Sequence, residues 1–132
     1  MARMLCALMV GAVLAASPAA ASEWMHCADA AGAASFDYLG GDGPEVLAVE
    51  ALTITAGEKV WASDPANGPG DPVTVGQAFE TADSIAIDAL DKDAVRFAQL
   101  RLSRAREGDS VALGGTLSIK GQGAWVVSCA PG

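Results

Sequence analysis

Short apolar segments, separated by glycine, proline, aspartate and asparagine, run along the chain from about residue 24 onward. Several segments alternate apolar and polar positions, as Phe36 and Tyr38 or Ile85 and Ile87 do, and this period of two is typical of half-buried strands. The pattern predicts about seven to nine short strands at a spacing typical of a small antiparallel β-sandwich or β-barrel. The segments that carry it are residues 24–27, 34–39, 46–56, 60–62, 73–79, 84–90, 94–105, 111–113, 116–119 and 124–129.

Residues 94–105 carry signals for both kinds of secondary structure. Leu100 and Leu102 alternate with polar neighbours, which favours a half-buried strand. Acidic residues precede the segment, arginines end it, and Gly108 follows it, which are the signals of helix termini. We expect a strand because the neighbouring segments are β-like, and a helix is the alternative.

Three further patterns predict local irregularities. The apolar residues move from odd-numbered to even-numbered positions between Val49 and Leu52, which predicts a bulge or bend in the strand. Gly114-Gly115 is interpreted as a tight turn or a bulge. The ten-residue segment 63–72 contains three prolines and is expected to be a loop that no helix or strand runs through.

The first 21 residues have the features of a secretory signal peptide. Arg3 gives a short positive start, residues 5–16 form an apolar stretch too short to span a bilayer, and residues 19–21 are the small residues of a cleavage site. We expect cleavage after Ala21, with an uncleaved anchor as the alternative. Residues 22–132 (132 − 21 = 111 residues) are then expected to form a single β domain that is periplasmic or secreted through the general secretory route, with no membrane association.

Removal of the leader leaves two cysteines, Cys27 and Cys129, close to the two ends of the mature chain. Two cysteines in an oxidising compartment allow one disulfide. A redox or metal-binding pair is the alternative, but the chain has no CxxC motif, no second histidine and no third mature cysteine to complete a ligand set. The sequence therefore predicts a structural disulfide between the terminal strands.

The chain is strongly acidic, with 8 basic and 16 acidic residues and a net charge of −8. Without Arg3 the balance is 7 − 16 = −9. Such a charge disfavours binding to nucleic acids and to anionic membranes, because both need basic surfaces. It favours a basic protein as a partner, since electrostatic steering speeds that association.

No sequence motif assigns a catalytic residue, a metal site or a cofactor. The nucleophile motif GxSxG and phosphate-binding glycine motifs are absent, and the only histidine, His26, is expected to be a partly exposed side chain of the first strand. Two acidic groups could offer oxygen ligands to calcium, but neither has the spacing of a calcium loop, and we expect solvated turn residues. These groups are Asp37, Asp42 and Glu45, and Asp88, Asp91 and Asp93.

The proline-rich loop is the most distinctive candidate binding element. Long loops on rigid β scaffolds are frequent binding sites, and proline lowers the entropy that a loop loses when it binds. We take four residues of this loop and its approach as candidate binding residues: Trp61, Asp64, Asn67 and Asp71.

In general form, the chain resembles small periplasmic β-barrel proteins such as the bacterial lysozyme inhibitors, which are exported, of similar size, and carry one disulfide near their termini. The resemblance is one of architecture, and no inhibitory motif of those families is present, so no residue role carries over. The absence of catalytic motifs, the expected export, the disulfide-linked β scaffold and the acidic charge favour a non-catalytic binding or inhibitory protein that acts on a basic envelope protein such as a lysozyme-type hydrolase. The alternatives are a small carboxylate-dependent hydrolase or metal-binding enzyme, and a structural or accessory subunit of a cell-envelope complex.

Overall fold

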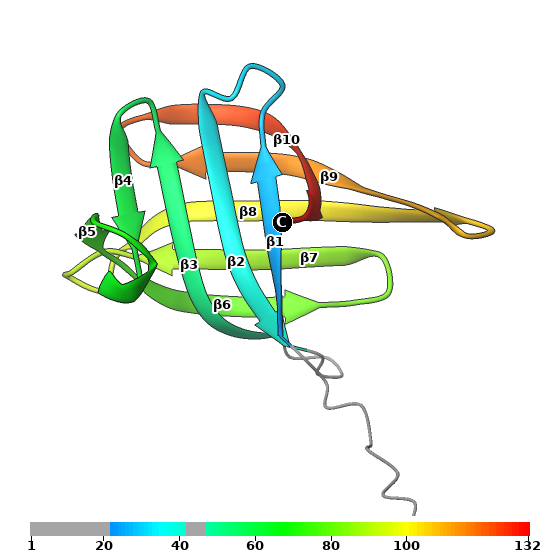
Figure 1. Ribbon diagram of the computed structural model, residues 1–132, viewed down its shortest axis with the longest axis horizontal. Coiled ribbons are helices and arrows are strands. Elements are labelled where there is room, and N and C mark those ends of the chain that lie inside the picture. Colours follow the sequence, from blue (N-terminus) through cyan, green and yellow to red (C-terminus); the bar gives the residue numbers. More distant parts are fainter. Residues whose placement is uncertain (1–21, 42–46) are drawn as a thin grey trace, which may run out of the picture.

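The computed structural model describes residues 22–41 and 47–132, and the regular structure in these ranges is almost entirely β (Figure 1). The expected all-β fold is therefore confirmed. There are ten strands rather than seven to nine: segments 111–113 and 116–119 join into one strand, and an additional two-residue strand forms inside the proline-rich loop. The strands are β1 (Glu23–Ala28), β2 (Ala34–Gly41), β3 (Ala48–Ala56), β4 (Lys59–Ala62), β5 (Asp71–Pro72), β6 (Thr74–Glu80), β7 (Ser84–Leu90), β8 (Arg96–Glu107), β9 (Ser110–Ile119) and β10 (Gly123–Pro131).

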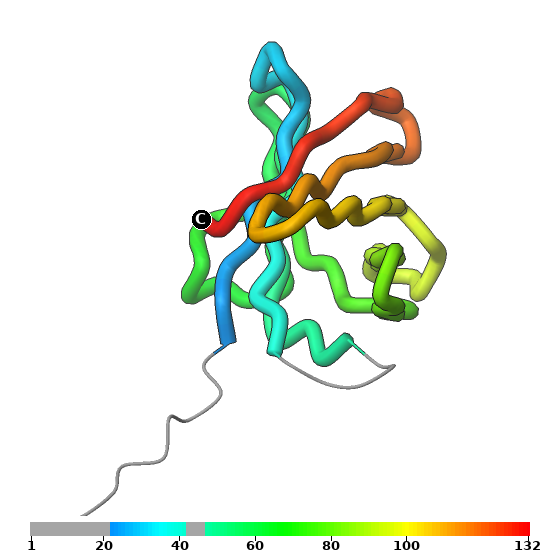
Figure 2. The backbone as a smooth tube through the Cα atoms, turned by 90° about the vertical axis from the view of Figure 1, so that its right-hand side faces the viewer, coloured from blue at the N-terminus to red at the C-terminus, as the bar shows by residue number. Residues whose placement is uncertain are grey.

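The strands form one sheet in the order β5-β4-β3-β2-β1-β10-β9-β8-β7-β6. Each half of the sheet follows the chain order, and pairing of the terminal strands β1 and β10 joins the halves. Figure 1 shows β1 to β4 crossing in front of β6 to β9, and the turned view of Figure 2 shows the two halves meeting along the terminal strands. Contacts between β3 and the edge strand β6 bring the two halves together on the side away from β1 and β10, so the sheet is a nearly closed barrel.

The barrel interior is filled by the apolar positions of the alternating strands. The period of two that Phe36 and Tyr38 showed in the sequence is the core face of β2, and Ile85 and Ile87 are the core face of β7. The largest fully buried side chains come from both halves of the sheet: Phe36, Leu52, Ile54, Ile87, Leu100, Leu117, Ile119 and Cys27. One continuous core therefore holds the two halves against each other.

Segment 94–105 forms a strand, as expected, and the alternative of a helix is wrong. Ala98, Leu100 and Leu102 are buried core residues of β8, which pairs with both β7 and β9. The acids that resemble a helix start belong to the turn between β7 and β8. There Asp91 Oδ1 accepts hydrogen bonds from the backbone N–H groups of Asp93 (2.9 Å) and Val95 (3.0 Å).

The bulge expected between Val49 and Leu52 is confirmed. The register of β3 against β2 skips Glu50, because Leu39 pairs with Ala51 and the next residue of β2, Gly40, pairs with Val49. This extra residue accounts for the change in apolar parity along β3.

The turn or bulge expected at Gly114-Gly115 is wrong, since both glycines lie inside β9 in unbroken register with β8 and β10. The reason for glycine is a close approach of two backbones. A Cβ at position 115 would lie 1.9 Å from the carbonyl oxygen of Arg101 on β8. The glycine pair therefore lets neighbouring strands pass closely at this point of the barrel.

The expectation for the proline-rich loop needs a similar correction. The loop contains a 3-10 helix, Pro65–Asn67, and strand β5, which pairs in parallel with β4 through Trp61 and Asp71. Proline stands at the first helical position, where its missing N–H has no bond to lose. Short regular elements thus tie the loop back onto the barrel.

The turn between β7 and β8 offers a test of backbone strain. Ala94 adopts φ of 58°, the only positive φ of a non-glycine residue in the described parts of the chain. An L-residue pays a steric cost in this conformation that glycine does not pay. We expect Ala94→Gly to raise the free energy of unfolding by about 0.5 to 1 kcal/mol.

Urea unfolding of the Ala94→Gly variant measures this gain. Gly57→Ala is the matched control, because Gly57 has nearly the same φ of 57° with open space around it. That change should lower stability by a similar amount. A loss of stability in Ala94→Gly would contradict the assignment of strain to this position.

The buried phenol of Tyr38 gives a pH-dependent prediction. Burial, with a smaller contribution from the nearby Glu80 carboxylate, raises the pKa of Tyr38 from 10.0 to about 12. Between pH 10 and 12 the unfolded chain therefore releases a proton that the native protein keeps. We expect this group to cost about 2 to 3 kcal/mol of stability as the pH rises through that interval.

Tyr38 is the only tyrosine in the chain, so phenolate absorbance at alkaline pH reports its ionisation without interference. The native protein should titrate near pH 12 and the urea-unfolded protein near pH 10. The Tyr38→Phe variant should lose less stability over this interval than the parent. Native titration near pH 10 would show that the phenol is not buried as the structure places it.

Among residues 22–41 and 47–132, no helix has both the length and the apolar character needed to cross a membrane. The signal peptide expected at residues 1–21, and Asp42 and Glu45 of the first acidic group, lie outside the described residues. The signal peptide and the single-domain boundary at residue 22 stay predictions.

Candidate binding site at one end of the barrel

A hollow of about 460 Å³ opens where β4, β5 and the turn between β7 and β8 approach one another. Figure 1 shows these elements at its left, at one end of the barrel. Its volume lies in the range of ligand-binding clefts, and barrel mouths are common places for such sites. The lining residues are Trp61, Asp71, Pro72, Val73, Asp91, Lys92 and Phe97.

An aromatic pair and a buried valine make the floor of the hollow apolar. Trp61, only 8% exposed, is held on β4 between Ile54 of β3 and Asp71 of β5. Its ring packs against Phe97, with the ring centroids 4.8 Å apart and the planes inclined by 54°. Such tilted aromatic contacts stabilise both rings beyond the area they bury.

A β-bulge places Phe97 in this contact. In the register of β8 with β7, Ala98 pairs with Ala89 and Arg96 pairs with Leu90, so Phe97 is the extra residue. A bulge breaks the strict alternation of side chains and redirects the residue it contains. Phe97 therefore joins Trp61 although it neighbours the core residue Ala98.

Charged side chains surround the mouth of the hollow. Asp71 and Lys92 are exposed, and Asp91 is half-buried. The backbone hydrogen bonds to Asp91 Oδ1 fix the orientation of that carboxylate, and Oδ2 accepts no hydrogen bond from the described residues. The rim thus combines two carboxylates with one flexible lysine.

Two of the four binding residues expected from the sequence, Trp61 and Asp71, lie together in this hollow. The other two do not line it. The Asp64 side chain accepts a hydrogen bond from the backbone N–H of Ala66 (2.9 Å) and caps the 3-10 helix, and Asn67 ends that helix as an exposed residue. A role of this loop in binding stays a prediction.

The sequence did not indicate Phe97 or Lys92 as binding residues, and it indicated Asp91 only as a possible calcium ligand. One feature of the sequence could have indicated Phe97. It is a large aromatic residue at a position where the alternation of the strand, through Gln99 and Arg101, predicts a polar side chain. Asp91 and Lys92 are in a turn about 20 residues from the proline-rich loop, and no local pattern indicates that the two meet.

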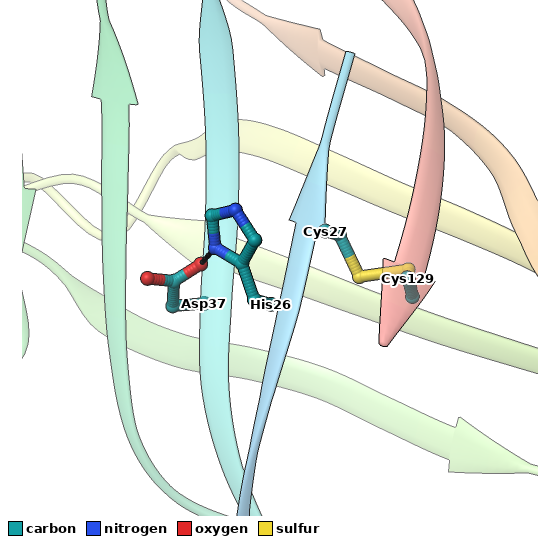
Figure 3. The surroundings of a disulfide bond; sticks show 4 residues. All are labelled: His26, Cys27, Asp37 and Cys129. Carbon is teal, nitrogen blue, oxygen red and sulfur yellow. Dashed lines mark hydrogen bonds and ion pairs between the residues drawn. A yellow bond between two sulfur atoms is a disulfide. The ribbon is translucent and has the colours of Figure 1, made fainter. Parts of the chain in front are cut away.

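A second group of polar residues lies on the outer face of β1 and β2 (Figure 3). His26 Nδ1 lies 2.5 Å from Asp37 Oδ1, and the imidazole is 52% exposed, as a partly exposed histidine of the first strand should be. No serine or threonine hydroxyl among the described residues hydrogen-bonds to His26. The pair therefore has the base and its orienting carboxylate but no positioned nucleophile.

Figure 3 also shows the disulfide between Cys27 and Cys129, which confirms the expected pairing of the terminal strands. The two residues lie directly opposite each other in the ladder of β1 and β10. Cys27 points into the core and is fully buried. The bridge thus fastens the ladder that joins the two halves of the barrel.

The acidic residues considered as calcium ligands have different partners in the structure. Asp88 is buried and accepts a hydrogen bond from the Arg101 guanidinium at 2.7 Å, while Asp37 pairs with His26 and Asp91 with its own turn. Within residues 22–41 and 47–132, no group of three or more histidine, cysteine, aspartate or glutamate side chains is placed to hold a metal ion.

Two arginines of β8 form ion pairs with nearby acids. Arg101 covers Asp88, and Arg104 lies 2.7 Å from Glu80 on β6. These pairs tie β8 to β7 and to the edge strand β6, so both guanidinium groups have structural partners.

Comparison of the chain with family models, with curated proteins and with solved structures gives no significant match. The resemblance to lysozyme inhibitors therefore rests on architecture alone, and function has to be argued from the site.

Proposed function

We propose that this protein is an exported, non-catalytic binding or inhibitory protein of the bacterial envelope, and that it acts on a basic protein such as a lysozyme-type hydrolase. The observation that supports this proposal best is the hollow at the barrel end, with Trp61 and Phe97 on its floor and Asp71 and Asp91 on its rim. An apolar, aromatic concavity with a few charged groups is the usual form of a recognition site.

The scaffold around the hollow supports a role in recognition. Its floor belongs to strands β4 and β8, and β5 and the prolines fix the adjoining loop, so little ordering entropy is lost on binding. Phe97 is half-buried at the hollow and rests on the buried ring of Trp61, and aromatic residues are enriched at interfaces. The site thus has an aromatic surface and a rigid frame.

The charge of the chain supports a basic partner. With a net charge of −9 after loss of the leader (7 − 16), long-range attraction would orient and speed an encounter with a cationic protein. Because salt screens such attraction beyond about 10 Å at 0.1 M, binding should weaken as salt is added.

Direct binding of the purified protein to a lysozyme-type hydrolase tests this function. We expect Kd to rise at least about tenfold between low and moderate salt, mainly through slower association. A similarly basic protein that is not a cell-wall hydrolase serves as the comparison. If neither the hydrolase nor the comparison protein binds at low salt, the proposal is refuted. If Kd does not change with salt, the electrostatic argument for a basic partner is wrong.

Matched variants place the binding site. Asp71→Asn with Asp91→Asn should weaken binding about tenfold. Asp83→Asn with Asp109→Asn changes the net charge equally at two exposed turns, after β6 and after β8, and should have a much smaller effect. Equal losses in the two double variants would show that total charge, rather than the hollow, determines binding.

A further inference from the structure

We infer that the hollow is a pocket for the guanidinium side chain of an arginine on the basic partner. The inference rests on the proposed function and specifies the group that the site receives. It combines three features of the described residues: an aromatic corner, an apolar wall and an oriented carboxylate.

The aromatic corner suits a planar cation. Phe97 is half-buried, lines the hollow and packs against Trp61 with the ring centroids 4.8 Å apart and the planes inclined by 54°. Trp61 is only 8% exposed, so Phe97 offers most of the aromatic surface and Trp61 supports it from below. A guanidinium group stacks on aromatic faces and is more weakly hydrated than an ammonium group, so it loses less on entering an apolar site.

The remaining floor suits the stem of the same side chain. Pro72 is exposed in β5 and lines the hollow beside Val73, which is only 3% exposed, so Pro72 supplies most of the apolar surface at this place. Long cationic side chains bury their methylene groups against such surfaces while the charged end reaches polar groups. The pocket can therefore take both the apolar and the charged part of arginine.

The carboxylates at the rim supply the charge and the geometry. The backbone of the β7–β8 turn holds Asp91 Oδ1 through two hydrogen bonds of 2.9 and 3.0 Å, which leaves Oδ2 as an acceptor in a fixed orientation. Asp71, held in register beside Trp61, adds a second acidic group. A guanidinium carries five N–H donors in one plane and forms its strongest hydrogen bonds with carboxylates.

Lys92 does not reverse this preference. It is exposed on the rim, and its single charge is opposed by two carboxylates, so the mouth keeps a net charge of −1 from these three groups (−2 + 1). An anionic ligand would have to approach both aspartates to reach this one lysine. The charge at the mouth therefore selects a cation.

Titration of the isotopically labelled protein with three short peptides, monitored by NMR, tests the inference. The peptides are acetyl-Gly-Arg-Gly-amide, the same peptide with lysine, and the same peptide with citrulline, the neutral isostere of arginine. We expect saturable shifts of the Trp61 indole N–H and the Asp91 and Phe97 amides with arginine. Binding should be about fivefold weaker with lysine and lost with citrulline.

Variants that keep the fold locate the contact. Trp61 is buried and its replacement can unfold the chain, so Phe97→Leu and Asp91→Asn are the informative changes, and each should weaken arginine binding at least about fivefold. Asp83→Asn is the control and should leave it unchanged. Equal binding of arginine and lysine peptides, or shifts that are not centred on Trp61, would overturn the inference.

Failure of the inference can be separated from failure of the proposed function. A basic protein that binds in a salt-dependent way, while the arginine peptide shifts no resonance at Trp61, refutes the arginine pocket and keeps the binding function. If the arginine peptide binds specifically but no basic protein binds, the proposed partner is refuted, and the preference of the pocket for arginine remains supported.

Discussion

Removal of the disulfide, by Cys27→Ala together with Cys129→Ala, is expected to lower the free energy of unfolding by about 4 to 5 kcal/mol. The bridge joins residues 102 positions apart, so it removes a large part of the conformational freedom of the unfolded chain. Its place in the fold adds to the effect, because it crosses the four-pair ladder that joins the two halves of the sheet. This loss is comparable with the whole stability of many small domains.

Urea unfolding of the parent and of the double variant, each with and without reductant, measures the contribution of the bridge. Reductant should lower the free energy of unfolding of the parent to the value of the variant, and it should not change the free energy of unfolding of the variant. In unfolded, unreduced protein, neither Cys27 nor Cys129 should be alkylated when the modified positions are mapped by mass spectrometry. Alkylation at both positions, or equal stability of parent and variant, would contradict the prediction.

Gly115→Ala is expected to be the most harmful single-methyl addition in the sheet, with a loss of about 3 kcal/mol or more. The new Cβ would lie 1.9 Å from the carbonyl oxygen of Arg101, 2.9 Å from its carbon and 3.0 Å from the Leu102 Cα. All three are backbone atoms of β8, so no side-chain rotation relieves the contact. The strands would have to separate where Gly115 pairs with both Leu102 and Val127.

Gly41→Ala is the control for this change. Gly41 also lies in a strand, but among the described residues a Cβ there meets only the hydroxyl of Ser22 at 3.6 Å, an ordinary contact. We expect its stability to stay within about 0.5 kcal/mol of the parent. Thermal and urea unfolding of the two variants provide the comparison, and similar stabilities would show that β8 and β9 can move apart at little cost.

The strand pattern was readable from the sequence because each strand has one buried face. Ile85 and Ile87, or Leu100 and Leu102, alternate with residues that face outward, and this alternation decided the β assignment of residues 94–105 against the helix signals. Asp91 resembled a helix-start signal, because an aspartate side chain that can cap a helix can also accept the backbone hydrogen bonds of a tight turn.

The glycine pair in β9 could not be interpreted correctly from local sequence. Adjacent glycines are typical of turns, and the reason for Gly115 is the Arg101 carbonyl on another strand. The contact of β3 with β6, which nearly closes the barrel, is likewise not predictable from local sequence, because it joins strands that are distant along the chain. Such contacts depend on where the strands lie after folding, and no periodicity within one strand encodes them.

The candidate site was partly predictable. Trp61 and Asp71 were selected because they flank a stiff loop, and β5 then places them opposite each other. Phe97 was missed because a bulge changes the face on which it lies, and bulges depend on pairing with a second strand. The sequence therefore indicates the loop, while the opposing wall of the hollow is a property of the fold.

Pairing of the first strand with the last strand also sets an order of events during folding. A chain is synthesised from its N-terminus, so β1 can pair with β2 early but has to wait for β10, whose Cys129 lies 102 residues further on. Hairpins within each half close short loops and form first, because loop closure costs more entropy as the separation grows. Formation of the Cys27–Cys129 disulfide, in which both thiols lose their protons and an external oxidant of the compartment takes two electrons, is thus a late event. It locks an assembled barrel rather than guiding its assembly.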